Sequence, residues 1–174
     1  MFLGWFDAQE NGKQYTDRYG VALNVWADNK DITLYARWIV NYTIIYDLQG
    51  GEISNFVIYN IETPSFILNN PTKEGYTFIG WTGNNGDIPE LSVSVEHGTI
   101  GDLEFTANWA INQYTITLVF NNGNDNEEIE FDYQEDIVIE NPTWNRKSFV
   151  GWYEDEDLTI AHSYNKMPNK QYTL

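Results

Sequence analysis

The chain has 174 residues, with 26 acidic against nine basic side chains, a formal net charge of −17 and no cysteine. This charge makes nucleic acids and anionic membrane surfaces unfavourable partners, because both require a cationic contact patch. The lack of cysteine excludes disulfides, thiol chemistry and cysteine-rich zinc sites.

The first predicted element carries a tetrapeptide that occurs three times in the chain. Phe2–Trp5, Phe78–Trp81 and Phe149–Trp152 share the pattern Phe-x-Gly-Trp, with glycines 76 and then 71 residues apart. Recurrence at this spacing indicates an array of slightly more than two structural units of about 70 residues each. We expect each copy to form a strand in which the tryptophan anchors the core and the glycine permits close backbone approach.

A second landmark follows each of the first two tetrapeptides. Residues 32–38 and 103–109 alternate apolar and polar side chains, and each stretch ends in a tryptophan, Trp38 or Trp109. Alternation with a period of two predicts strands that have one buried face. We therefore expect Trp38 and Trp109 to be core residues like the tryptophans of the tetrapeptides.

A third landmark opens each of the last two units. Residues 42–48 and 114–120 alternate in the same way, and each is followed by a glycine-containing turn that is typical of a hairpin. In the last unit a second alternating strand follows over residues 129–133. Short apolar runs at 66–68 and 137–139 precede Asn-Pro turns. No segment shows a sustained helical stripe, so the sequence predicts a mainly β or α+β fold with at most one short helix per unit.

Two stretches of the middle copy resemble a known bacterial surface repeat. Residues 70–81 (NPTKEGYTFIGW) and 98–109 (GTIGDLEFTANW) are similar to the Listeria-Bacteroides repeat, also called the internalin B-type repeat. Residues 144–148 of the last copy depart from this pattern. The resemblance implies compact β-grasp-like units, divided here into the C-terminal half of a repeat (1–41), a complete repeat (42–113) and a repeat that lacks its last strand (114–174).

The chain contains little that points to catalysis or to a metal. No pair of carboxylates recurs between copies, and His97 and His162 occupy non-equivalent positions that favour surface residues. Residues 121–128 and 154–157 are rich in oxygen ligands, so Ca²⁺ binding is the alternative to solvated turns, although neither stretch has the spacing of an EF-hand loop. No lysine aligns across copies in a way that favours an isopeptide cross-link. We therefore predict no enzyme, no cofactor and no metal site.

The residues singled out are thus structural ones, and they form the repeat motif: Gly4, Trp5, Trp38, Gly80, Trp81, Trp109, Gly151 and Trp152. A sugar-stacking role is the alternative for these tryptophans. Trp26 and Trp144 have no aromatic counterpart in the other copies, so exposure and binding are favoured there more than for the motif residues.

The resemblance implies a non-catalytic stalk or spacer of a bacterial cell-surface protein, located outside the cell. The alternative is a dedicated adhesion module that binds a glycan or a protein of a host or neighbouring cell. The chain is expected to be a fragment, because Met1–Leu3 lacks the regions of a signal peptide and both ends interrupt a repeat. The incomplete end repeats leave strand edges that favour self-association.

Overall fold

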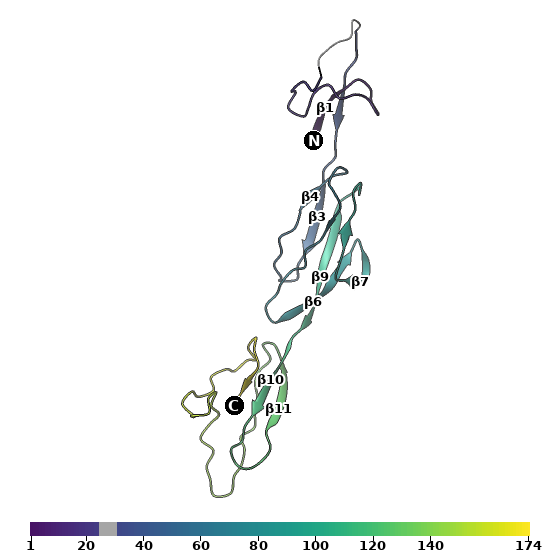
Figure 1. The fold of residues 1–174 in the computed structure, drawn as a ribbon. Coiled ribbons are helices and arrows are strands. Elements are labelled where there is room, and N and C mark those ends of the chain that lie inside the picture. Colours follow the sequence, from purple (N-terminus) through teal and green to yellow (C-terminus); the bar gives the residue numbers. More distant parts are fainter. Residues whose placement is uncertain (25–30) are drawn as a thin grey trace.

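The computed structural model describes residues 1–24 and 31–174. All regular structure in the described residues is strand, so the prediction of a mainly β fold is confirmed. The strands form three groups that follow one another along an elongated molecule, with the N-terminus and the C-terminus at opposite ends (Figure 1). We call these groups the first unit (1–41), the middle unit (42–113) and the third unit (114–174).

The middle unit contains a five-stranded sheet in the order β4-β3-β9-β6-β7. Its two central strands, β3 and β9, are parallel, and the other neighbours are antiparallel. A short antiparallel pair, β5 and β8, accompanies the sheet. The strand bounds are β3 Tyr42–Asp47, β4 Ile58–Tyr59, β5 Phe66–Ile67, β6 Tyr76–Gly83, β7 Gly86–Glu90, β8 Ser94–Val95 and β9 Leu103–Ile111.

Side chains from five of these strands and from two residues next to strands build the core of the middle unit. On β9, Phe105 and Ala107 are buried while Glu104 is exposed, which is the face predicted from the alternation of residues 103–109. A strand with one buried face places every second side chain in the core. The buried cluster consists of Ile44, Tyr59, Leu68, Trp81, Val93, Val95, Phe105 and Ala107.

The third unit has a smaller sheet in the order β11-β10-β12, with β10 at Gln113–Leu118, β11 at Glu127–Asp132 and β12 at Tyr172–Thr173. β10 and β11 form the predicted antiparallel hairpin. β12 pairs parallel with β10, with Ile116 opposite Tyr172, as Ile44 lies opposite Leu103 in the middle unit. The last residues of the chain therefore start the closing strand that the sequence led us to expect to be missing.

The first unit is a two-stranded antiparallel sheet of β1 (Phe2–Phe6) and β2 (Tyr35–Trp38). The strand predicted for residues 32–38 begins only at Tyr35, and its exposed face is the opposite of the expected one. Ala36 and Trp38 are exposed, whereas Tyr35 and Arg37 are half-buried. Arg37 lies over the ring of Phe6, and its guanidinium donates hydrogen bonds to the backbone of residues 8 and 9, which accounts for the change of face.

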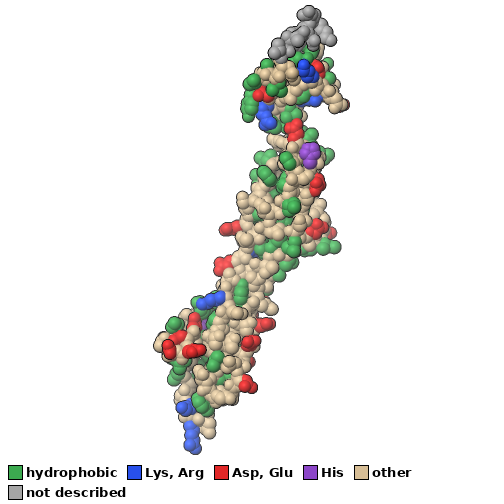
Figure 2. All heavy atoms as spheres, viewed as in Figure 1, with side chains coloured by type: hydrophobic (Ala, Val, Ile, Leu, Met, Phe, Trp, Pro, Cys, Tyr) green, Lys and Arg blue, Asp and Glu red, His purple; other side chains and the backbone are tan. Residues whose placement is uncertain are grey.

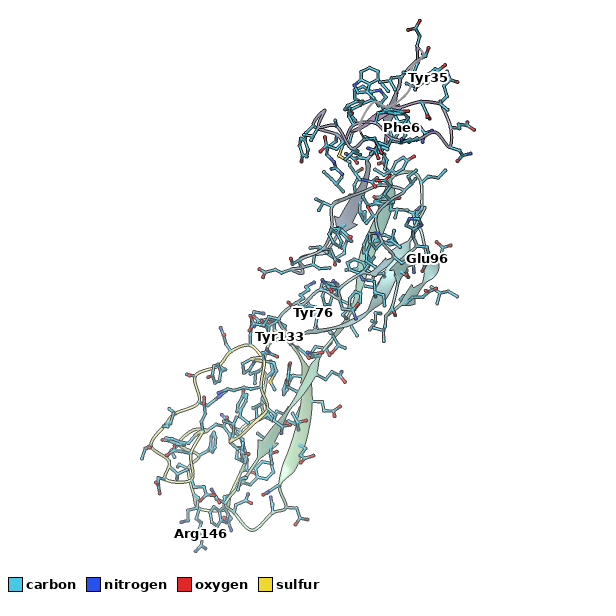
Figure 3. The ribbon with its side chains drawn as sticks, turned by 45° about the horizontal axis from the view of Figure 1, so that its top comes forward. Phe6, Tyr35, Tyr76, Glu96, Tyr133 and Arg146 are labelled. Carbon is cyan, nitrogen blue, oxygen red and sulfur yellow. The ribbon has the colours of Figure 1, made fainter. Side chains whose placement is uncertain are left out.

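The junction between the middle and third units is short and hydrogen-bonded. Asn112 alone separates β9 from β10; its backbone N–H donates to the carbonyl of Gly75, and its carbonyl accepts from the N–H of Tyr133. The Thr77 hydroxyl donates to Asn112 Oδ1 at 2.6 Å. The rings of Tyr76 and Tyr133 meet edge to face across the junction, with centroids 6.1 Å apart (Figure 3).

Candidate functional site

The tetrapeptide of the middle unit is fully integrated into its sheet. Trp81 has no exposed surface, and its ring packs against Tyr46, Phe78 and Phe105 with centroid distances of 5.6, 5.3 and 6.3 Å. Gly80 has a φ of +136°, and a Cβ at this position would lie 2.5 Å from the backbone nitrogen of Glu90. The glycine is therefore required both by backbone conformation and by close approach.

Trp109 closes the same core from the neighbouring strand. Its ring lies 5.5 Å from that of Phe78, and its Nε1 donates a hydrogen bond of 3.1 Å to the carbonyl of Leu48. A Cβ at Gly51 would lie 2.5 Å from this indole ring. The turn after β3 thus covers Trp109 and satisfies its only donor.

The equivalent tryptophans of the first unit are surface residues, which corrects the expectation that they anchor a core. Trp5 is 41% exposed and Trp38 is 70% exposed, and both rings contact Phe2. The physical reason is the sheet: among the described residues, β2 pairs only with β1, so no counterpart of β3 and its turn covers Trp38. Gly4 is still closely packed, because a Cβ there would lie 2.1 Å from the carbonyl oxygen of Thr16.

The tetrapeptide of the third unit differs from both. Residues 149–152 form no strand, although the Trp152 carbonyl accepts a hydrogen bond from the N–H of His162 and the next residue, Tyr153, forms an isolated bridge with Ala161. Trp152 is half-buried and packs against Phe120 and Phe149, at 5.9 and 5.2 Å. A Cβ at Gly151 would meet nothing closer than a ring carbon of Tyr153 at 3.8 Å, so the close approach expected at this glycine is not present.

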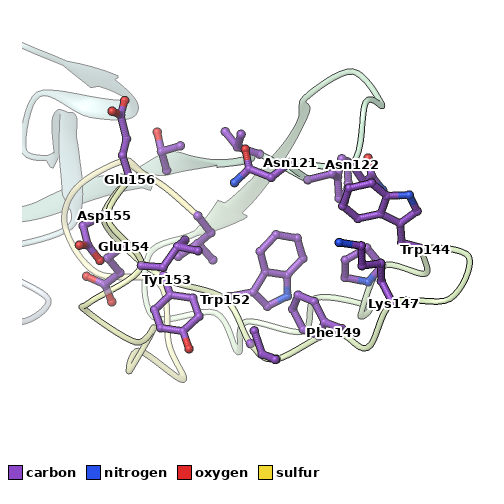
Figure 4. Close-up of a pocket in the computed structure, with 18 of the residues that line it drawn as sticks. Asn121, Asn122, Trp144, Lys147, Phe149, Trp152, Tyr153, Glu154, Asp155 and Glu156 are labelled. Carbon is purple, nitrogen blue, oxygen red and sulfur yellow. The ribbon is translucent and has the colours of Figure 1, made fainter.

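A cavity of about 580 Å³ lies beside this tetrapeptide (Figure 4). One wall is the turn after β10, with Phe120 and Asn121, and the opposite wall is formed by Phe149 and Trp152. Trp144, which the sequence analysis singled out, lies at its rim and is 49% exposed, with Lys147 Nζ 5.1 Å from its ring. Trp26, the other tryptophan singled out, lies outside the described residues.

The two oxygen-rich stretches are turns in the structure. In residues 154–157, the Asp155 carboxylate accepts hydrogen bonds from the Thr159 hydroxyl and from the N–H groups of Thr159 and Ile160, and these bonds lower its pKa. In residues 121–128, Asn122 Oδ1 accepts from the N–H of Asn124. In residues 1–24 and 31–174, no three His, Asp or Glu side chains are grouped as a metal site. Acidic side chains are spread along the visible face of the molecule (Figure 2).

The two histidines lie far apart in structure as well as in sequence. His97 is exposed, and its backbone N–H donates to the Ser65 hydroxyl. His162 stacks on Tyr172 with centroids 5.7 Å apart, and its Nδ1 is 3.4 Å from Glu154 Oε1. Burial raises the pKa of Tyr172 to about 12, and the nearby Glu154 adds to this effect. Sequence reasoning missed this cluster, because its members come from separate segments of the third unit and share no motif.

A model of the Listeria-Bacteroides repeat domain matches residues 42–107 and 114–174. The chain belongs to the Listeria-Bacteroides repeat family. The two matches cover the middle unit and the third unit, and they include the tetrapeptides at Phe78–Trp81 and Phe149–Trp152. Family membership confirms the resemblance that the sequence motifs indicated.

Curated relatives contain similar stretches within much longer proteins. Two proteins of Evansella cellulosilytica, whose names describe them as membrane proteins, are 31% and 29% identical over 94% of this chain. Internalin H of Listeria monocytogenes is 37% identical over 46% of the chain. The chain spans only 24%, 20% and 14% of the length of these relatives. No solved structure matches it. Among the described residues, no helix is long and apolar enough to cross a membrane.

Proposed function

We propose that this chain is a non-catalytic spacer within a bacterial cell-surface protein, where its repeats hold another domain away from the cell. Membership of the Listeria-Bacteroides repeat family and similarity to part of Internalin H support an extracellular, surface-protein repeat region. The acidic surplus supports solubility and mutual repulsion of neighbouring copies in this setting.

The observation that carries the spacer role is the junction at Asn112. A flexible connection between units would allow them to fold back on one another, whereas here a single residue joins two sheets and is bonded on both sides. A Cβ at Gly75 would lie 1.9 Å from the Tyr133 ring, so the two units are in intimate contact at this point. Such a junction restricts the orientation of one unit relative to the next.

We further propose that each complete unit is β-grasp-like. The five strands of its sheet are β3, β4, β6, β7 and β9. If they are numbered 1 to 5 in this chain order, their order in the sheet is 2-1-5-3-4, and the first and last strands are parallel neighbours. The third unit repeats the 2-1-5 part of this order in β11-β10-β12. These features support the assignment. A solved structure of the middle unit that has no helix and a different strand order in its sheet would contradict it.

Adhesion is the second candidate function, with a glycan or a surface protein of a host or neighbouring cell as partner. The aromatic cavity beside Trp144 and Trp152 favours it. A repeated adhesion site would have a counterpart in each unit, but β9 occupies the corresponding place next to β6 in the middle unit. The spacer role is therefore the better supported of the two.

Single-molecule energy transfer tests the spacer role, because the chain has no cysteine and two can be introduced at will. We would label Ile88→Cys and Val138→Cys, at positions that are exposed in the middle and third units. A stiff junction predicts one narrow transfer distribution. Asn112→Gly should broaden it, whereas the control Asn126→Gly, in an exposed turn of the third unit, should not. A broad distribution in the otherwise unchanged chain would contradict the spacer role.

A further inference from the structure

We propose that the middle unit resists tension along the chain, and that strands β3 and β9 form the mechanical clamp that gives it this resistance. The proposal goes beyond the spacer role. A spacer needs stiff junctions between its units, whereas resistance to tension is a property of the sheet inside one unit. The clamp consists of the parallel pairing of β3 with β9 and of the side-chain contacts around it.

The topology decides how a pull acts on the middle unit. The chain enters the unit at Tyr42, the first residue of β3, and leaves it at Ile111, the last residue of β9. These two strands are parallel neighbours, and both run along the length of the molecule toward the third unit (Figure 1). A pull on the chain at both sides of the unit therefore drags β3 and β9 in opposite directions along their own axes.

The direction of the pull matters because the backbone hydrogen bonds of a parallel pair run across from one strand to the other. Ile44 lies opposite Leu103 and Asp47 opposite Thr106, with two further pairs between them. Sliding the strands along their axes strains the bonds of all these pairs at once, whereas separating the strands from one end breaks the bonds one after another. The same bonds therefore resist sliding more strongly than they resist opening.

The paired strands also lie inside the sheet and over its core. β4 flanks β3 and β6 flanks β9, so neither strand is an edge of the sheet. Ile44 and Phe105 are buried in the same apolar cluster, and the ring of Tyr46 stacks on that of Phe105 with centroids 6.3 Å apart. Sliding β3 along β9 therefore also exposes apolar core surface to water, which adds to the resistance.

Side-chain hydrogen bonds tie the two strands together beyond both ends of the pairing. At one end, the Asp102 carboxylate accepts from the N–H and from the hydroxyl of Thr43, at 2.7 and 2.9 Å. At the other end, Trp109 Nε1 donates to the Leu48 carbonyl at 3.1 Å. Both ties join the segment where the chain enters the unit to the segment where it leaves. A pull along the chain therefore strains them together with the pairing.

The strand β7 is placed differently and provides a control. It lies at the edge of the sheet, its five residues are exposed, and among the described residues it pairs only with β6. Because β3 and β9 are bonded directly to each other, tension passes between them without passing through β7. Changes in β7 are therefore not expected to alter the resistance to a pull.

Unfolding of the full chain in optical tweezers tests the clamp, with handles attached to introduced cysteines because the chain has none. Val40→Cys with Gln113→Cys, at exposed positions before β3 and after β9, slides the strands along each other. Val40→Cys with Ile100→Cys, both exposed and both at the start of the pairing, separates the strands from that end. We expect the first geometry to need an unfolding force several times that of the second. Equal forces would overturn the proposal.

Two further measurements show that direction, and not stability, sets the force. The gain in length, about 3.3–3.6 Å for each released residue, identifies each event as unfolding of the middle unit. Urea unfolding of the two cysteine pairs should give the same free energy of unfolding for this unit, because all three positions are exposed. A difference in force that only follows a difference in this free energy would count against the clamp.

A matched pair of substitutions in the first geometry locates the resistance. Asp102→Ala removes the tie to Thr43 and should lower the unfolding force. Asp87→Ala removes an exposed carboxylate of β7 and should leave the force unchanged. Equal losses in the two variants, or no loss in Asp102→Ala, would contradict the proposal.

The outcome is independent of the energy-transfer test of the spacer role. A broad transfer distribution would reject stiff junctions, but it would leave a high unfolding force of the middle unit in place. Equal forces in the two pulling geometries would reject the clamp, but they would leave stiff junctions in place.

Discussion

The middle and third units contain the same tetrapeptide, but only the middle unit uses it as a strand. Phe78–Trp81 lies between β9 and β7, and its tryptophan is completely buried. Phe149–Trp152 belongs to no strand of the described residues, although its Trp152 carbonyl accepts from the N–H of His162, and its tryptophan lines a cavity. The comparison shows that a local motif determines a strand only when the sheet provides a partner for its edges.

The first unit lies between these extremes. Its tetrapeptide has a partner strand, but that strand has no neighbour on its other side in the described chain. Gly4 is tightly packed, as Gly80 is, while Trp5 and Trp38 remain exposed. Backbone pairing and core formation are therefore separate steps, and the second step needs more strands than the first.

The largest expected difference between units concerns the tryptophans themselves. Trp81→Ala empties a fully buried site and should lower the free energy of unfolding of the middle unit by about 3–5 kcal/mol. Trp5→Ala removes a partly exposed ring and should cost about 1 kcal/mol or less in the first unit. Native-state hydrogen exchange of β6 and β1 amides measures the two losses separately. Equal losses would contradict the difference in core formation.

The two glycines give a sharper version of the same comparison. Both have φ values in the left-handed region, +136° for Gly80 and +146° for Gly151, so alanine is strained at either site by about 1–3 kcal/mol. At Gly80 the new Cβ also meets the backbone of Glu90, whereas at Gly151 its nearest neighbour is a ring carbon of Tyr153 at an ordinary contact distance of 3.8 Å. Urea unfolding should therefore show a larger loss for Gly80→Ala. A larger loss for Gly151→Ala would mean that the third unit is packed more tightly than the structure indicates.

A smaller effect is expected for the hydrogen bond of Trp109. Trp109→Phe keeps an aromatic ring but loses the bond from Nε1 to the Leu48 carbonyl, which should cost about 1 kcal/mol in the middle unit. Trp38→Phe changes an exposed ring and should have almost no effect on stability. Urea midpoints of the two variants, compared with the unchanged chain, check this prediction.

The smallest effect at ordinary pH comes from Tyr46 in the middle unit. Burial raises the pKa of Tyr46 to about 12 from its usual value of 10.0, so the folded unit holds the phenol proton more tightly than the unfolded chain does. The stabilisation is therefore fully present below pH 10 and is lost as the pH rises toward 12. Tyr46→Phe should reduce this alkaline slope of the unfolding free energy, and the raised pKa values of Tyr59 and Tyr172 account for the slope that remains. An unchanged slope would show that another group titrates.

The sequence predicted the strands of the middle unit well because their pattern and their surroundings agree. The alternation in residues 103–109 correctly predicted that Phe105 and Ala107 are buried. The same pattern in residues 32–38 led to the wrong face, because Arg37 packs on Phe6 and no third strand among the described residues covers Trp38. Periodicity identifies the two faces of a strand, but the neighbouring strands decide which face is buried.

The candidate cavity could not be predicted in this way. It is formed by the turn after β10, by the tetrapeptide Phe149–Trp152 and by Trp144, which are brought together only by the fold. The one sequence signal was that Trp144 has no aromatic counterpart in the other copies. The contact of His162 with Tyr172 and Glu154 gave no signal, because the three residues lie in separate segments of the chain.

Amide hydrogen exchange of the full chain, resolved by peptide, most directly tests whether the strand partners decide where the shared motif forms a core. The amides of Phe78–Trp81 should be protected far longer than those of Phe2–Trp5, and those of Phe149–Trp152 should exchange fastest. Adding the sequence of Thr106–Ile111 after Leu174 should then slow exchange in Phe149–Trp152 toward the rate of the middle unit. Equal protection of the three tetrapeptides in the unextended chain would contradict this account.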